Sequence, residues 1–488
     1  MRPQNLLFIF SDQHDPQFLG AAGHRIVRTP SLDALARRGT RLVNATTPCP
    51  ICVPARASLA TGRWVHDNRC WDNGQPYDGS IPSWGHRLIE RGHRVAAIGK
   101  LHYRSDADDN GFSEKIETMN VVEGIGDRLG WLRRRRFERG AARDLSRTAA
   151  RGDSAYADYD RRILEESQEW LRKRAAEPAD KPWVLFVGFV MPHLPLIAPI
   201  EFFDLYRPDS LPPPRLYAPE LRPRHPWIEW LTQVLPYDKY FDDRSRKTAI
   251  AAYHGMVSFL DHNIGQLLQT LQATGLDAST RVIYTSDHGE MLGNHGIWGK
   301  SCLYQESVGV PMIMAGEGVP AGTTANTEVS LVDCYPTILE AVGVAPPQED
   351  RGLPGRSLFG LIGKPDPERA GFSEYHAAAS PSGAFMVRRG RWKYVHYAGM
   401  PPQLFDLEAD PIEARDLGED PAHAAARAEM EALLRRIVDP DRANAQAFAD
   451  QEARIQAHGG PERVLAIGDF GHTPTPYEKA HFAPSLEA

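Results

Sequence analysis

The chain has 488 residues, of which 42% are hydrophobic and 24% charged, and its formal net charge is −7. This balance is typical of a soluble globular protein, and the negative charge gives no reason to expect a nucleic-acid partner. No apolar run reaches the roughly 18 residues of a membrane helix, so we expect no membrane partner. The five cysteines, an odd number, do not indicate a disulfide framework, so we expect a cytoplasmic protein.

The predicted elements alternate between apolar strands and helices. We interpret residues 5–10, NLLFIF, as a buried first strand, because no small-residue cleavage site follows that would mark a signal peptide. Thr29-Pro30-Ser31 predicts the start of a helix, with Thr29 as the N-cap. Continuous apolar strands alternating with helices predict a largely parallel sheet that is covered on both faces. The further strands are predicted at residues 94–100, 183–189, 281–286 and 310–314, and the further helices at about 82–92, 155–176 and 246–274.

Two regions depart from this alternation. An irregular insert at residues 104–153 contains four consecutive arginines at 133–136, a run that predicts a solvated face. After residue 365, short alternating segments and a helical stretch at about 421–438 predict a small antiparallel sheet with one helix. We therefore divide the chain into a main α/β domain at residues 1–365, a C-terminal α+β subdomain at 366–440 and an extended tail at 441–488.

The tail carries aromatic residues without a clear period. Phe448, Phe470, Tyr477 and Phe482 recur among Gly and Pro, which is not the composition of a fully disordered segment. Aromatic anchors need a surface, either the chain's own body or a neighbouring subunit. We expect the tail to cross to a partner in a homodimer or homotetramer and to line the mouth of the active site; a frayed end is the alternative.

Polar residues stand where the predicted strands end. In parallel sheets ligands bind at the carboxyl ends of the strands. These residues include two carboxylates, an amide oxygen and an imidazole, a set that predicts a site for Ca²⁺, Mn²⁺ or Mg²⁺ in preference to structural zinc. Taken alone, any one of them is also explained by a helix cap or a loop hydrogen bond. The predicted metal ligands are Asp12, Gln13, Asp287 and His288. The nearby cationic or donor groups are Lys100, His102, His193 and Lys300. Together with a metal, these groups suit an anion such as sulfate, phosphate or phosphonate.

The stretch CPICVPARASLATGR, residues 49–63, contains Cys49 and Cys52 at a spacing also used for redox or zinc sites. A thioredoxin-like pair would need its own early βαβ unit, and a zinc site would need a second cysteine pair, which the other three cysteines do not supply. From Cys52 onward the residues read C-x-P-x-R-x4-T-G, ending at Thr61-Gly62. This pattern resembles the maturation signature of type I sulfatases, in which the cysteine is oxidised to formylglycine.

Local physics favours an anion at Cys52. Residues 55–61 are good helix formers and Gly62 is a suitable stop, so Cys52 is predicted at a helix N-terminus. Free N–H groups and the helix dipole stabilise negative charge there. Arg56, about one turn further on, lies on the same side as Cys52 and can orient the modified side chain through fixed hydrogen bonds.

The resemblance covers most of the chain and keeps the family's order. Asp12-Gln13 stands at the first metal pair, with Gln in place of the family's second Asp, and SDHGEMLGNHGIWGK at 286–300 resembles the second metal motif followed by the substrate lysine. The closest likeness is to choline-sulfatase-like and phosphonate-monoester-hydrolase-like members of the alkaline phosphatase-like superfamily. The matching positions are Asp287-His288, Lys300, the Lys-x-His of Lys100 and His102, the substrate histidine His193 and the pocket asparagine Asn73.

The resemblance implies an α/β/α sandwich and a sulfuric ester hydrolase with one divalent metal, with Ca²⁺ favoured over Mn²⁺. The formylglycine from Cys52, made by a formylglycine-generating enzyme, would also be a metal ligand and would attack sulfur. Arg56, Lys100 and Lys300 would hold the sulfuryl oxygens, His193 or Lys300 would support the leaving oxygen, and His102 would be the base that releases sulfate.

Three functions stay open. A hydrolase of aryl or small alkyl sulfates, with choline sulfate among the candidates, is favoured over a phosphonate monoester or phosphodiester hydrolase that uses the same nucleophile. A catalytically silent binding protein is disfavoured because every catalytic position holds a suitable residue. Choline would need an aromatic cage. The sequence does not bring together the aromatics nearest the motifs, which are Trp71, Tyr77, Trp84, Tyr103 and Trp131.

Overall fold

The apolar run near the N-terminus forms the centre of the main sheet. In the computed structural model, which describes residues 2–177, 180–484 and 486–487, β1 (Asn5–Ser11) pairs in parallel with a strand on either side. Its side chains alternate between two cores: Leu7 joins the cluster on one face of the sheet and Phe8 the cluster on the other. A strand buried on both faces reads as a continuous apolar run, which is why it was predictable.

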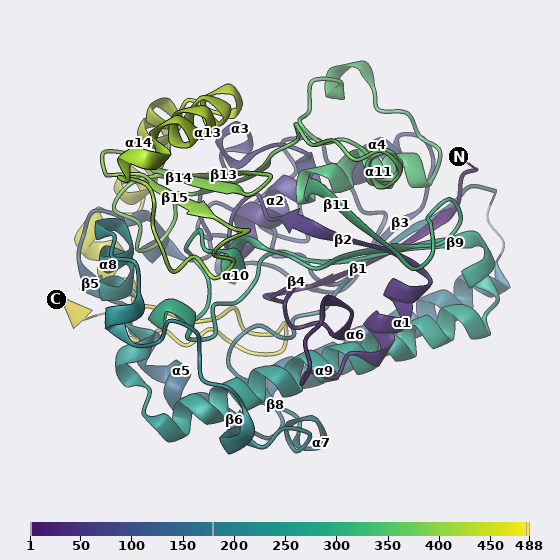
Figure 1. Ribbon diagram of the computed structural model, residues 1–488. Helices are drawn as coiled ribbons and strands as arrows, with labels where there is room; N and C mark the ends of the chain where they lie inside the picture. The colour runs from purple at the N-terminus through teal and green to yellow at the C-terminus, as the bar shows by residue number, and fades with distance from the viewer. Residues whose placement is uncertain (1, 178–179, 485, 488) are drawn as a thin grey trace.

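The main sheet has eight strands and is mostly parallel (Figure 1). Only β10 is antiparallel to both neighbours. The predicted mostly parallel sheet is thus confirmed. It also contains three strands that were not predicted, β2, β4 and β11, because polar residues interrupt their apolar pattern. In spatial order the strands are β11 (Thr323–Ser330), β2 (Gly39–Thr46), β10 (Met312–Ala315), β9 (Thr280–Ser286), β1, β7 (Val184–Gly188), β3 (Val95–Lys100) and β4 (Glu114–Met119).

Helices cover both faces, which gives the predicted α/β/α sandwich. Figure 1 shows the long helices α6 and α9 along one face, while α2, α4 and α11 lie on the other. The first predicted helix start is confirmed, although Thr29 makes no side-chain cap and instead accepts a hydrogen bond from Gly20 N. The main helices are α1 (Pro30–Arg37), α2 (Cys52–Thr61), α4 (Trp84–Ile89), α6 (Ala155–Ala176), α9 (Asp243–Ala273) and α11 (Cys334–Ala341), and the shorter ones are α3 (Val65–Asn68), α5 (Ala142–Thr148), α7 (Ile200–Phe203), α8 (Pro226–Val234), α10 (Gln305–Val308) and α12 (Leu358–Gly363).

The C-terminal subdomain has the expected antiparallel sheet and helix. Its four strands pair in chain order, and α13 packs across them through a small core of its own. The side chains of Phe385 and Val387 on the sheet and of Leu433 and Leu434 on the helix are fully or almost fully buried in that core. The elements are β12 (Gly371–Tyr375), β13 (Ala384–Arg389), β14 (Trp392–Tyr397), β15 (Gln403–Asp406) and α13 (Ala424–Ile437).

The region expected as an extended tail begins with two helices. α14 (Pro440–Ala457) and α15 (Pro461–Ile467) precede an irregular segment that runs to residue 484. The Asp439 side chain accepts a hydrogen bond from Arg442 N and caps α14, and Pro440 suits the first helical position. The expectation of an extended segment was wrong here because α14 buries Ala443, Ala447 and Gln451, residues that give almost no hydrophobic period.

The arginine run at residues 133–136 is not simply a solvated face. Arg133 is 1% exposed, donates to Ser380 and Gln451, and stacks its guanidinium over the Phe448 ring at 4.1 Å. It therefore ties the insert to the subdomain loop and to α14. Arg134 is exposed, and its guanidinium also lies over the Phe448 ring, at 3.9 Å from the ring centroid.

Within the described residues, no helix is both long and apolar enough to cross a bilayer. All five cysteines are buried and free. Cys49 and Cys52 form no disulfide in the structure, and Cys49 packs in an apolar cluster that does not include Cys52.

Replacing Arg133 should destabilise the fold. Arg133→Ala leaves the Ser380 and Gln451 partners without a charged donor and opens a cavity, so the free energy of unfolding should fall by about 2–3 kcal/mol. Equilibrium urea unfolding followed by tryptophan fluorescence measures this. The matched control, Arg134→Ala, should cost less than about 1 kcal/mol because its cation–π contact is exposed. Equal losses in the two variants would contradict the role assigned to Arg133.

Candidate active site

The carboxyl ends of four adjacent strands gather most of the side chains predicted from the sequence. β9, β1, β7 and β3 lie side by side and parallel, so the residues that follow them meet at one edge of the sheet. All of these side chains are buried. They are Asp12 and Gln13 after β1, Lys100 at the end of β3, His193 after β7, and Asp287 and His288 after β9.

Cys52 is the first residue of α2, as its sequence context predicts. Gly62 ends this helix at φ +67°, and a Cβ there would lie 2.9 Å from the Tyr335 ring, so glycine is required. The Sγ atom of Cys52 lies 3.2 Å from His288 Nε2 and 3.4 Å from Lys300 Nζ. Asn73 Oδ1 accepts a hydrogen bond from Val53 N at 3.0 Å and so holds the first turn of the helix.

Arg56 joins the two carboxylates that follow β1 and β9. Its Nη2 donates to Asp12 Oδ2 at 3.1 Å, its Nε to Asp287 Oδ2 at 2.9 Å, and its Nη1 to the Lys100 carbonyl at 2.9 Å. The guanidinium is 2% exposed and does not line the cavity over Cys52. The resemblance implied that Arg56 contacts the substrate, whereas in the structure it holds the carboxylates from behind.

These contacts leave the other oxygen of Asp12 facing the cluster. Burial alone would favour the protonated form of Asp12, but Lys100, His193 and Arg56 together hold its pKa well below the usual range. Lys100 Nζ lies 2.5 Å from Oδ2, while Oδ1 lies 3.7 Å from Cys52 Sγ and from His288 Nε2. Asp12 is therefore an anion with one oxygen available to a ligand.

Four side chains could hold a cation. Ligand atoms of Asp12, Cys52, Asp287 and His288 lie within 4.8 Å of one another. His288 Nδ1 donates to the Gly289 carbonyl, which directs Nε2 into the group, and burial lowers its pKa to about 4, so the ring is the neutral form that binds metals. Two carboxylates and a neutral imidazole suit a hard or borderline divalent ion. The donor set thus fits the predicted metal centre.

Gln13 occupies the edge of this group. Its amide oxygen accepts a hydrogen bond from Lys300 Nζ at 2.6 Å, and its amide nitrogen donates to Glu290. Glu290 in turn accepts from Leu292 N and Gly299 N. The amide is held in one orientation with its oxygen towards Lys300, and it belongs to the set of residues gathered at the strand ends.

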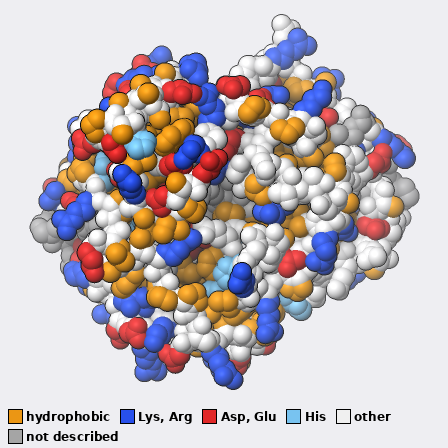
Figure 2. Space-filling model, viewed as in Figure 1, with side chains coloured by type: hydrophobic (Ala, Val, Ile, Leu, Met, Phe, Trp, Pro, Cys, Tyr) orange, Lys and Arg blue, Asp and Glu red, His pale blue; other side chains and the backbone are white. Residues whose placement is uncertain are grey.

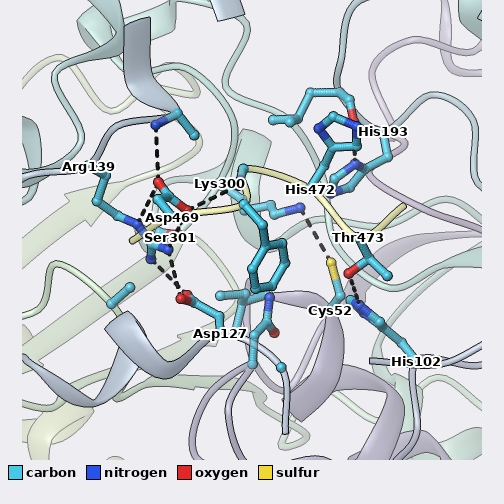
Figure 3. A pocket seen from close by; sticks show the side chains of 18 of the residues that line it. Cys52, His102, Asp127, Arg139, His193, Lys300, Ser301, Asp469, His472 and Thr473 are labelled. Carbon is cyan, nitrogen blue, oxygen red and sulfur yellow. Dashed lines mark hydrogen bonds and ion pairs between the residues drawn. The ribbon is translucent and has the colours of Figure 1, made fainter. Parts of the chain in front are cut away.

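A cavity of about 100 Å³ lies over Cys52. Figure 3 shows Lys300, His193 and His102 around it, each from a different loop. Burial, reinforced by Lys100 for His102 and by Lys300 for His193, keeps the pKa of both imidazoles well below the usual range. The fixed positive charge at the cavity therefore comes from Lys100 and Lys300, because Arg139, which also lines it, is paired with Asp127 and Asp469. Such a small cationic cavity suits a compact anion. The sequence-predicted residues that line it are Cys52, Asn73, Lys100, His102, His193 and Lys300.

The C-terminal segment supplies part of the wall, as expected, but it comes from the same chain. Thr473 Oγ1 lies 2.8 Å from His102 Nε2, and its carbonyl accepts from Tyr156 OH (Figure 3). Asp469 pairs with Arg139, which also binds Asp127 through two hydrogen bonds of 2.7 Å. These residues were not identified from the sequence, because GDFGHTPTP has no period and no motif. Whether the chain also forms a homodimer or homotetramer stays a prediction.

The aromatic residues considered for a cage are core residues. Trp71, Tyr77, Trp84, Tyr103 and Trp131 are each at most 3% exposed, and none lines the cavity over Cys52. Among the described residues that do line it, the phenyl-type rings are Tyr237 and Phe470. Three imidazoles also line it, those of His102, His193 and His472.

Comparisons with known proteins agree on one family. Residues 4–344 match the family described as Sulfatase, and residues 293–439 match the one described as N-sulphoglucosamine sulphohydrolase, C-terminal. The chain is 30% identical to choline-sulfatase of Rhizobium meliloti (strain 1021) over 88% of this chain and 85% of that one. It is 29% identical to arylsulfatase K of Homo sapiens over 84% and 78%, respectively. A solved structure, the phosphonate monoester hydrolase of Agrobacterium radiobacter, superposes with a TM-score of 0.70 at 25% identity, covering 89% of this chain and 95% of that one.

Removing one carboxylate should empty the metal centre. Asp287→Ala deletes a donor from the group and should reduce bound divalent metal from about one equivalent to less than a tenth, as measured by elemental analysis of the purified protein. Asp15→Asn is the matched control, because Asp15 is a buried carboxyl after the same strand as Asp12 but lies outside the donor group. Unchanged metal in Asp287→Ala, with a native circular dichroism spectrum, would refute the assignment.

Proposed function

Because the chain belongs to the sulfatase family and is a sulfuric ester hydrolase, we propose that its nucleophile is a formylglycine made from Cys52. One observation carries the proposal: Cys52 Sγ stands at the N-terminus of a buried helix, 3.4 Å from Lys300 Nζ and beside two carboxylates and an imidazole. Helix N–H groups and a lysine stabilise an oxyanion at this position. A formylglycine-generating enzyme is the partner that this maturation requires.

We assign the metal to Asp12, Gln13, Asp287 and His288, together with the oxygen that replaces Cys52 Sγ. When bound, the cation lowers the pKa of the nucleophilic hydroxyl and stabilises charge on the sulfuryl oxygens. Ca²⁺ is favoured over Mn²⁺ because oxygen donors outnumber nitrogen in this set. Arg56 bonds to both carboxylates and fixes their orientation for this role, which is why it lies behind them instead of against the substrate.

The chain's own cations hold the sulfate group. Lys300 Nζ, between Gln13 Oε1 and Cys52, reaches the space above the nucleophile, and Lys100 borders the same cavity. His193 Nδ1 donates to the Leu194 carbonyl, which leaves Nε2 towards the cavity. His193 or Lys300 can therefore contact the leaving oxygen. Charge stabilisation by groups fixed before the reaction supplies most of the catalysis in this arrangement.

His102 is the proposed base that removes a proton from the second hydroxyl of the hydrated formylglycine; the C–O bond to the sulfate group then breaks, the aldehyde forms again and sulfate leaves. Its Nε2 bonds to Thr473, and its Nδ1 is buried without a hydrogen-bond partner in the protein. If Nε2 carries the hydrogen and donates to Thr473, Nδ1 is a bare acceptor. A buried unpaired nitrogen is unfavourable unless a ligand completes it, which supports a catalytic role for this atom.

We propose that the leaving group is uncharged. Choline-sulfatase of Rhizobium meliloti is a relative of this chain, but a quaternary ammonium group is best held by a cage of aromatic faces. The described residues over Cys52 offer two phenyl-type rings and no tryptophan. An aryl or alkyl sulfate without a cationic group suits this lining better than choline sulfate does.

A second candidate is a phosphonate monoester hydrolase with the same nucleophile. It is favoured by the similarity to the Agrobacterium radiobacter phosphonate monoester hydrolase. Parallel assays on 4-nitrophenyl sulfate and on a phenyl phosphonate monoester, both with purified matured protein, separate the two. If the protein is a sulfatase, kcat/KM should be higher on the sulfate ester, and Cys52→Ala should show no turnover. A higher kcat/KM on the phosphonate ester would favour the second candidate. Wild-type activity in Cys52→Ala would exclude both.

The bond from Thr473 to His102 should matter for turnover. Thr473→Val keeps the side-chain shape but removes the hydroxyl, so the imidazole loses its fixed orientation and kcat should fall about tenfold, equivalent to about 1.4 kcal/mol. KM and metal content should change little because the substrate-binding lysines and the metal ligands are untouched. Thr473→Ser restores the hydroxyl and should restore kcat. A Val variant with wild-type kcat, or a Ser variant as slow as Val, would contradict this role.

A further inference from the structure

We infer that a second, larger cavity beside the one over Cys52 is a subsite for the leaving group, and that it selects an uncharged leaving group with an apolar ring body. This inference rests on the sulfate ester hydrolysis described above and specifies the substrate class. It is carried by the volumes, the walls and the charges of the two cavities.

The two cavities differ fivefold in size and share a wall. The inner cavity over Cys52 has about 100 Å³, enough for a compact anion and a few waters, whereas the outer one has about 520 Å³, within the range that encloses drug-sized ligands. Leu194 lines both and directly follows His193, the histidine that faces the leaving oxygen. A substituent on that oxygen therefore extends into the outer cavity. The residues that line both are Ala141, Leu194, Tyr237, Asp469, Phe470, Gly471 and His472.

The walls of the outer cavity come from three elements. Leu145 lies on α5, Leu194, Pro195 and Ile197 follow β7, and Phe470 belongs to the C-terminal segment. These side chains make apolar contact surface, and each Å² of apolar surface that a ligand buries contributes roughly 25 cal/mol. A ring system with an apolar body fits such walls, and a single small alkyl group would leave most of the volume unfilled.

The charges around the outer cavity do not suit an anionic leaving group. Asp469 is already paired with Arg139, and the remaining acids and base, Asp144, Glu478 and Lys479, are exposed at the rim. The imidazoles of His472 and His481 and the phenol of Tyr237 complete the titratable groups of the lining. A second sulfate group would meet no excess of cations there. On the face seen in Figure 2, positive and negative side chains are likewise interspersed.

A tryptophan placed in the outer cavity tests the inference. Ala480 lines the outer cavity and a neighbouring one bordered by Met119 and Phe482, but not the cavity over Cys52. It is half-buried and makes no side-chain hydrogen bond, so Ala480→Trp narrows the outer cavity without removing a contact. With matured enzyme, kcat/KM should fall at least tenfold for a four-ring steroid 3-sulfate and less than twofold for 4-nitrophenyl sulfate. Thr148→Trp, from α5, should act in the same direction. The matched control is Ala428→Trp on the remote helix α13, which should alter neither ester.

The outcomes separate the subsite from the proposed function. Equal losses of kcat/KM on both esters, or no loss on the steroid sulfate in either tryptophan variant, would overturn the subsite. The proposed sulfatase activity would still stand if the wild-type protein hydrolyses 4-nitrophenyl sulfate. A wild-type preference for a polysulfated saccharide over both esters would overturn the charge argument. Failure of wild-type matured protein to hydrolyse any sulfate ester would instead refute the proposed function itself.

Discussion

The active site depends on one buried cation. Arg56, about one turn after Cys52 on α2, donates to Asp12 and to Asp287, which follow two neighbouring parallel strands. The guanidinium thereby fixes the distance between the helix that carries Cys52 and the edge of the sheet. Its removal would leave two buried carboxylates without their shared partner, a loss of about 3–5 kcal/mol for buried pairs of this kind. The geometry of the nucleophile and of the metal ligands therefore has a common origin.

Different parts of the chain contribute different kinds of group. The sheet edge supplies charges whose positions are set by backbone pairing, which is suited to electrostatic catalysis because little reorganisation is needed during the reaction. The C-terminal segment supplies Thr473 beside His102 and Phe470 in the outer cavity. It is held to the insert by Arg139, which pairs with Asp127 and Asp469 at once. Charge recognition is thus built into the geometry of the sheet, while leaving-group contacts come from loops around it.

The parts that sequence analysis predicted are those where one physical pattern dominates. β1, β7 and β9 are continuous apolar runs, and the polar residues directly after them, such as Asp12 and Asp287, meet because parallel strands share an edge. The parts it missed depend on long-range contacts. α14 buries Ala447 and Gln451 and so lacks an apolar period. Arg133 is buried because it bonds to Ser380 and stacks on Phe448, both distant in the sequence. A role for Thr473 follows only from its contact with His102. Arg56 was identified, but its contacts with both carboxylates required the structure.

The proposed turnover depends on Cys52 acting as an aldehyde and not as a thiol. The most direct measurement prepares protein with graded maturation, by co-expression with increasing amounts of a formylglycine-generating enzyme, and compares two quantities in each sample. Peptide mass spectrometry gives the aldehyde fraction at residue 52, and initial rates on 4-nitrophenyl sulfate give kcat per mole of chain. The account predicts that kcat rises in proportion to the aldehyde fraction and extrapolates to zero for the pure thiol. Full turnover by protein whose Cys52 is entirely unmodified would contradict it.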